Sequence, residues 1–215
     1  MSRSWPILWT AVTLAAVTGC AAGEQPGPAP VSASPSTGSA YYTGLSGECP
    51  TLTSPEAVRF TGSRTPVGIR SPKQPDSQRI DCSWRPSSAI PPWVVAALTI
   101  YDGPDTGRQA AEKSFNLGRE YDTSRANFSS AIRATERTTP SGPAYAVANA
   151  TGSLSQTDQL SQTTLIGNVV VNVLLLEEPD PGVDGSTRAA ELLTDLAATG
   201  DAITAEIAGQ LVSQT

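Results

Sequence analysis

Apolar and polar residues alternate along several segments in the middle of the chain, and this pattern predicts a β-sheet. Because successive side chains of a strand point to opposite faces, each segment gives one purely apolar face and one mixed face. In residues 94–101, for example, Val94, Ala96, Leu98 and Ile100 share the apolar face. The strands that we expect are residues 79–85, 93–101, 131–138, 144–151 and 163–176.

Helical spacing in three other segments completes the predicted fold. A short helix starts near Thr53, which has capping-box spacing to Glu56. A second helix over 105–121 has a narrow apolar stripe, and a long amphipathic helix over 187–212 closes the domain. The segments left as loops are 61–78 and 152–162. Because the apolar strand faces should meet the helices, we expect an α+β fold, a two-layer sandwich with a mainly antiparallel sheet and helices packed on one face.

The mixed faces of the predicted strands hold the candidate ligand face. Hydroxyl, amide and aromatic groups gather there, a mixture that small-molecule sites use. The same alternation is ordinary for an antiparallel sheet with one face in water, so a solvated surface and a groove for a small apolar ligand both stay open. The residues of this candidate ligand face are Thr99, Tyr101, Tyr145, Asn149, Asn168 and Asn172.

The first twenty residues have the layout of an export signal that ends in a cysteine. Arg3 precedes an uncharged apolar run over residues 5–17, which is too short to span a bilayer comfortably. The ending Val17-Thr18-Gly19-Cys20 resembles the lipobox of bacterial lipoproteins, in which the signal is cut before the cysteine and the thiol receives diacylglycerol. The resemblance implies a signal peptide over 1–19 and a lipid anchor on Cys20. An ordinary secreted protein, cut one or two residues later, and an uncleaved membrane anchor are the alternatives.

Residues 20–46 are rich in Gly, Pro, Ser, Ala and Thr and predict a flexible tether. We expect one extracytoplasmic domain over residues 47–215, in a monomeric protein. The domain contains Cys49 and Cys82, which an extracytoplasmic location allows to pair. We expect a structural disulfide, because 32 residues separate the thiols and the chain has no C-x-x-C motif; a reactive redox pair is the alternative.

The composition excludes several classes of chemistry. The 215 residues contain no histidine, which excludes Ser-His-Asp and Cys-His catalysis and His-ligated zinc. A net charge of −6 argues against a nucleic-acid partner. The acids around 102–105 and 177–184 precede predicted helices, where capping explains them better than a metal ion does. We therefore expect no cofactor, no metal and no catalytic residue, with the paired carboxylates of a hydrolase as the alternative.

Short motifs in the domain carry a family resemblance. Cys49-Pro50 with a following Leu52, Asp81-Cys82-Ser83-Trp84 and Gly167-Asn168-Val169-Val170-Val171, together with Gly19-Cys20, resemble an actinobacterial family of small lipoproteins of unknown function. The domain is also similar in outline to the extracytoplasmic sensor domains of some actinobacterial receptor kinases. The resemblance implies a lipid-anchored protein on the outer side of the cell membrane with a non-catalytic binding or accessory role. A carboxylate-dependent envelope hydrolase and a protein-interaction partner of an envelope complex are the alternative functions.

Overall fold

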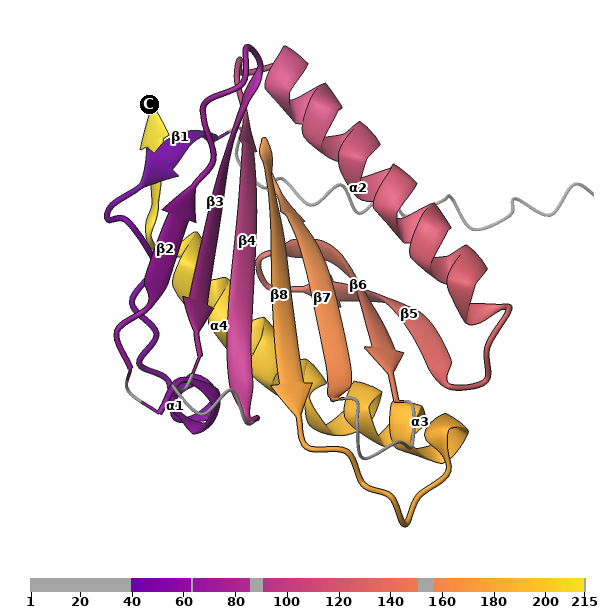
Figure 1. Ribbon diagram of the computed structural model, residues 1–215. Helices are drawn as coiled ribbons and strands as arrows, with labels where there is room; N and C mark the ends of the chain where they lie inside the picture. The colour runs from indigo at the N-terminus through magenta and orange to yellow at the C-terminus, as the bar shows by residue number, and fades with distance from the viewer. Residues whose placement is uncertain (1–39, 63, 86–90, 151–156, 215) are drawn as a thin grey trace, which may run out of the picture. The chain divides into compact units, whose positions relative to one another are not determined.

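A seven-stranded antiparallel sheet forms the centre of the structure, a computed structural model that describes residues 40–62, 64–85, 91–150 and 157–214 (Figure 1). The predicted signal peptide, Cys20 and most of the predicted tether lie outside these residues. All described residues belong to one unit of contacts, Ser36–Thr215. In spatial order the strands are β2 (Val67–Arg70), β3 (Ser77–Trp84), β4 (Trp93–Tyr101), β8 (Val169–Glu177), β7 (Asp158–Ile166), β6 (Gly142–Asn149) and β5 (Ile132–Thr139).

The apolar face of the sheet is covered by α1 (Pro55–Thr61), α3 (Gly185–Asp195) and α4 (Ala197–Ala208). Strand β4 buries Val94, Ala96, Leu98 and Ile100 in this core, as the alternation predicts. The alanines of β6 are buried where α3 packs on the sheet, because their small side chains let the helix approach closely. The α+β sandwich and its antiparallel sheet are therefore confirmed.

Helix α2 (Thr106–Ala126) packs on the other face of the sheet, whereas the sequence predicts helices on one face (Figure 1). Its Phe115 contacts Tyr145 of β6, with 5.3 Å between the ring centroids, and Val147 completes this second, smaller cluster. Gly118 permits the close approach, since a Cβ there would lie 2.6 Å from the Tyr145 hydroxyl. The mixed face of β6 thus carries enough apolar surface to bury the narrow stripe of α2.

All of β2 and the first half of β7 lie in segments that the sequence predicts as loops. The start of β7 is missed because polar residues at 158–162 hide its alternation, although Gln162 is fully buried on the core face. The predicted strand 163–176 is in fact the second part of a β7–β8 hairpin, which turns at Gly167 with a positive φ of 58°. Strand β2 is missed because its pattern extends over only four residues.

The two ends of the described chain form a separate two-stranded sheet, β1 (Tyr41–Leu45) and β9 (Leu211–Gln214). The folded part therefore begins before the expected boundary at residue 47, because Tyr42 and Leu45 pack against the core. The single helix expected over 187–212 is wrong, since α3 ends at Asp195, α4 begins after Leu196, and the last described residues are strand. None of the helices in the described ranges is both long enough and apolar enough to cross a bilayer.

Candidate functional site: a groove beside the disulfide

Tyr145 of the candidate ligand face is buried under α2 and is not open to a ligand. Burial raises the pKa of its hydroxyl, and the interaction with Thr163, which lowers that pKa, does not cancel the effect. Asp122 of α2 also interacts with this hydroxyl, and burial raises the pKa of the Asp122 carboxyl despite the nearby Arg125. Tyr145 therefore joins the helix to the sheet.

Asn168 is also buried and connects three parts of the backbone. Its amide nitrogen donates to the carbonyl oxygens of Tyr42 and Tyr101, at 2.8 and 2.7 Å. Its amide oxygen accepts from the backbone N–H of Tyr42 at 2.8 Å. With all three bonds made inside the fold, Asn168 attaches β1 to the end of β4 and has a structural role.

The other four residues of the candidate ligand face are half-buried and lie on different strands. Asn172 of β8 donates to the hydroxyls of Ser161 and Thr163, both at 2.8 Å. Thr99 and Tyr101 lie on β4 and Asn149 on β6, and strands β8 and β7 stand between them in the sheet. The structure therefore does not bring the six residues together around one groove.

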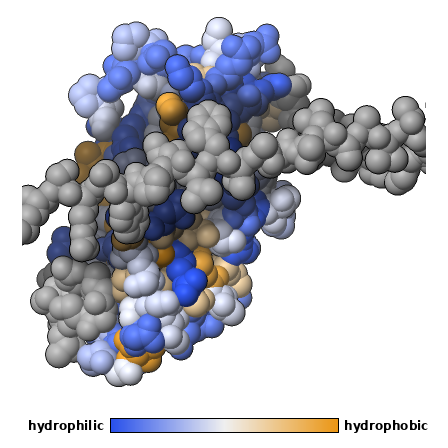
Figure 2. All heavy atoms as spheres, turned by 90° about the vertical axis from the view of Figure 1, so that its right-hand side faces the viewer, coloured by the Kyte–Doolittle hydropathy of each residue, from blue (hydrophilic) through white to orange (hydrophobic). Residues whose placement is uncertain are grey.

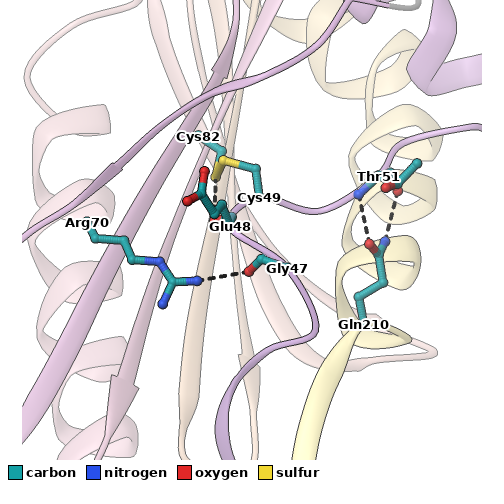
Figure 3. The surroundings of a disulfide bond; sticks show 7 residues. All are labelled: Gly47, Glu48, Cys49, Thr51, Arg70, Cys82 and Gln210. Atoms are coloured by element: carbon teal, nitrogen blue, oxygen red, sulfur yellow. Dashed lines mark hydrogen bonds between the residues drawn. A yellow bond between two sulfur atoms is a disulfide. The ribbon is translucent and has the colours of Figure 1, made fainter.

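The disulfide between Cys49 and Cys82 holds the segment after β1 against β3, as the sequence predicts (Figure 3). The two Cα atoms are 5.8 Å apart. Gly68 of β2 lies opposite Cys82, and a Cβ at Gly68 would come within 2.7 Å of the Cys49 sulfur. Only glycine fits there, because the bonded sulfur cannot move aside. Arg70 donates to the carbonyl of Gly47 at 2.9 Å and attaches the same segment to β2.

A groove of about 700 Å³ opens beside this disulfide, a volume within the usual range for binding sites. The buried side chains of Leu52 and Trp84 give it apolar surface, while Arg64 and Glu48 are charged and exposed. Three threonines add hydroxyl groups. The residues that line the groove are Glu48, Cys49, Pro50, Thr51, Leu52, Thr53, Val58, Arg64, Thr65, Pro66, Gly68 and Trp84.

The groove wall formed by residues 51–53 is hydrogen-bonded to the end of α4. The side chain of Gln210 accepts from the backbone N–H of Thr51 at 2.7 Å and donates to its carbonyl at 2.8 Å (Figure 3). The Glu206 carboxylate accepts from the backbone N–H and the hydroxyl of Thr53. These bonds give the wall a defined position although it has no strand or helix of its own.

Ser54 caps helix α1, and the predicted capping box between Thr53 and Glu56 is wrong. The hydroxyl of Ser54 accepts from the backbone N–H of Ala57 at 3.3 Å. Thr53 lies one residue too early for this role and bonds to Glu206 instead, a partner more than 150 residues away in the sequence. Local spacing could not reveal that competition.

The wall should weaken at low pH because of Glu206. Burial raises the pKa of this carboxyl, but the hydrogen bonds from Ser54 and Thr53 outweigh it and leave the pKa below its usual 4.5. Because this pKa is lower in the folded protein than in the unfolded chain, the carboxylate stabilises the fold at pH values above the unfolded-state pKa. This contribution is lost as the pH falls through the folded-state pKa. We expect Glu206→Gln to reduce the free energy of unfolding by about 1 kcal/mol near neutral pH, a value discounted for solvent screening.

Urea unfolding of the protein and of Glu206→Gln at about pH 6 and about pH 3 measures this contribution. The difference between the two proteins should shrink at the lower pH. A difference that stays constant between the two pH values would show that the Glu206 carboxylate does not support the wall.

The segment from Arg64 to Arg85 is basic although the chain as a whole is acidic. Residues 64–85 contain five of the 14 Lys and Arg residues but only Asp76 and Asp81 as acids, a net charge of +3 in a chain of −6. Asp81 pairs with Arg79 at 2.8 Å, and this hydrogen bond raises the pKa of the Arg79 guanidinium. Arg64 forms no ion pair with any described residue. The groove therefore has an exposed guanidinium that no acid among the described residues neutralises.

The predicted capping fails for the acids before α2, because Asp105 makes no side-chain capping bond and Asp102 pairs with Lys73, but it holds before α3. Asp184 caps the helix by accepting from the backbone N–H groups of Ser186 and Thr187, as predicted, and the Thr187 bonds lower the pKa of the Asp184 carboxyl. Glu177 and the buried Asp158 both pair with Arg188, at 3.2 and 2.8 Å. Within the part of the chain that the structure describes, no group of three or more acidic or cysteine side chains is arranged to hold a metal ion.

The sequence marks only part of the groove. The two cysteines locate it, but Arg64, Thr65 and Pro66 fall in a segment predicted as a loop. Their position depends on α1 and β2, which this segment connects. Val67-Gly68-Ile69-Arg70, a short alternation with a glycine at its centre, is the one signal that could have indicated a strand beside the disulfide.

Comparisons with known proteins do not assign the chain to a family. No protein-family model matches the sequence, and neither a curated protein nor a solved structure shows significant similarity to the chain. The resemblance to actinobacterial lipoproteins therefore stays a prediction based on short motifs, and function has to be inferred from the chain and its structure.

Proposed function

We propose that this protein is a lipid-anchored, extracytoplasmic binding module that acts without catalysis at the cell envelope. The observation that carries the proposal is the open groove of about 700 Å³ beside the disulfide, which lies in the domain that follows the lipobox sequence and the tether. Apolar surface, hydroxyl groups and one unpaired guanidinium are the groups that binding sites use for contact and orientation. Lipid on Cys20 would keep this groove close to the membrane surface.

The groove favours binding over the hydrolase alternative. Carboxylate-dependent glycoside hydrolysis uses two carboxyl groups about 5–10 Å apart on either side of the bond that is cut. Among the described lining residues, Glu48 supplies one carboxylate. A screen of envelope glycans with the purified protein should release no reducing ends. Release that Glu48→Gln abolishes would support the hydrolase instead.

Fractionation of cells that express the full chain tests the anchoring. We expect the protein in the membrane fraction and Cys20→Ser in the culture medium or the soluble fraction, because a single thiol carries the proposed lipid. Ser34→Ala in the predicted tether is the control, since it changes a residue near the anchor and leaves both the lipobox and the disulfide intact. Membrane association that survives Cys20→Ser would contradict the proposed anchor and would indicate the uncleaved signal.

A further inference from the structure

The two edges of the seven-stranded sheet differ in how they are protected against pairing with another strand. Strand β5 forms one edge and carries Arg133, Glu136 and Arg137, and charged residues of this kind discourage edge-to-edge pairing. Figure 2 shows this side of the molecule, where the described residues are largely hydrophilic and the apolar ones are scattered. Strand β2 forms the opposite edge (Figure 1).

Strand β2 exposes apolar side chains at its edge. Val67 and Ile69 are 66% and 65% exposed and lie on the same face of the strand. β-branched residues favour strand pairing, and the charges on this face, Asp81 opposite Ile69 and its partner Arg79, lie on β3 and pair with each other. The β2 edge is thus the less protected of the two.

Backbone groups of β2 also point away from the sheet. The backbone N–H of Ser71 donates to the carbonyl of Arg79 at 3.1 Å. Because hydrogen-bonded pairs alternate along an antiparallel ladder, residues 67, 69 and 71 are the ones that bond to β3. In an antiparallel pair the residues between them direct both N–H and C=O outward. Gly68 and Arg70 therefore present their backbone groups at the free edge, and β2 pairs only with β3 among the described strands.

The groove lies where alternate side chains of an added strand would reach. Gly68 belongs both to the free edge and to the groove lining, on the face of the sheet that carries the disulfide. An extended chain paired with β2 would direct every second side chain toward Thr65, Pro66 and the groove, and the others beside Val67 and Ile69. Backbone bonds and side-chain pockets would then act together.

Charge determines which extended chain fits best. Arg64, which precedes β2, and Arg70, its last residue, are exposed and form no ion pair with the described residues, whereas Lys73 and Arg79 are paired with Asp102 and Asp81. A second copy of this protein would bring the same two arginines to the shared edge, which electrostatic repulsion disfavours. The complementary partner is a segment rich in Asp and Glu.

We propose that the free edge of β2 binds an extended acidic peptide by strand addition, with the groove beside the disulfide accepting alternate side chains. This inference rests on the proposed binding function and names the class of its partner. The partner is a segment of another envelope protein that is extended or becomes extended on binding.

A fluorescent peptide of alternating glutamate and valine, about ten residues long, is the probe. It is titrated with the full mature chain carrying Cys20→Ser, which needs no detergent. We expect saturable binding with a Kd below about 1 mM, and no binding of the matched lysine–valine peptide.

N-methyl groups on the two central residues of the peptide should weaken binding at least about tenfold, because they block both hydrogen-bonding edges of the peptide. Equal binding of the N-methylated peptide would show charge attraction alone and overturn strand addition, as would the absence of saturable binding.

Arg70 offers a matched pair of variants. Arg70→Ala removes the guanidinium but keeps the outward N–H, whereas Arg70→Pro removes both and places its ring at the edge. We expect Arg70→Pro to bind the peptide at least about tenfold more weakly than Arg70→Ala. Equal affinity of the two variants would contradict the proposal. If Arg70→Pro unfolds, Ile69→Glu serves instead, since it places a repelling charge on the same edge.

Peptide binding at the β2 edge and lipid anchoring at Cys20 can be tested independently of each other. The peptide titration uses a lipid-free protein and does not depend on Cys20. Peptide binding together with a Cys20 that carries no lipid would retain the edge site and refute the anchoring. A lipid-modified Cys20 without peptide binding would retain the anchoring and refute the edge site.

Discussion

Replacing both Cys49 and Cys82 by alanine should reduce the free energy of unfolding by about 3.8 kcal/mol, the chain-entropy estimate for a closed loop of about 34 residues. The loss is large because the bond restricts the unfolded chain and holds residues 47–53, which have no secondary structure of their own, against β2 and β3. Stabilities of small domains are of the same order, so the variant should be close to unfolding at 37 °C.

Urea unfolding of the double variant measures this loss, and Cys20→Ser is the control because it leaves the disulfide intact. Reduction of the parent protein with a phosphine should reproduce the effect. A loss below about 1 kcal/mol, with unchanged unfolding after reduction, would show that the bond does not support the fold. Since Cys49 lines the groove, peptide binding should fall together with stability.

Replacing Asn168 by alanine should cost about 3 kcal/mol. The change leaves the N–H and C=O of Tyr42 and the C=O of Tyr101 without the partners that they have in the fold, and a buried group without a partner costs about 1–3 kcal/mol. The β1–β9 sheet depends on these bonds for its attachment to β4. We expect amide protons in β1 and β9 to exchange faster in this variant.

Asn172→Ala is the matched control for this prediction. It removes a half-buried asparagine of β8 that donates to two hydroxyls, and these hydroxyls can accept from water instead. We expect a loss of about 1 kcal/mol, measured by the same urea unfolding. Equal losses for the two variants would contradict the structural role assigned to Asn168.

The alternation of apolar residues predicts the central strands well and fails where polar residues enter the core. Strand β4 has the predicted bounds, because Val94 to Ile100 alternate without interruption. Strand β7 places Gln162 on the core face, where its amide donates to Asp201, and Asp201 in turn pairs with Arg137 at 2.6 Å. Such tertiary partners make a buried polar side chain tolerable, and they cannot be read from local sequence.

The candidate site could be predicted only in part for a similar reason. Cys49 and Cys82 indicate a disulfide from their location and number alone. The groove beside it depends on Glu206 and Gln210, which bond to residues far away in the sequence and position the wall. Conversely, Asn168 and Tyr145 have the chemistry of ligand groups, but the packing of β1 and α2 buries both of them.

The intact mass of the protein extracted from cell membranes is the decisive measurement, because it reports the cleavage site, the lipid and the disulfide together. We expect a chain that begins at Cys20, carries the mass of diacylglycerol and shows the mass loss of one disulfide, with Cys49 joined to Cys82 in the non-reduced digest. A chain that begins elsewhere or lacks the lipid would contradict the proposal that this protein is a lipid-anchored binding module.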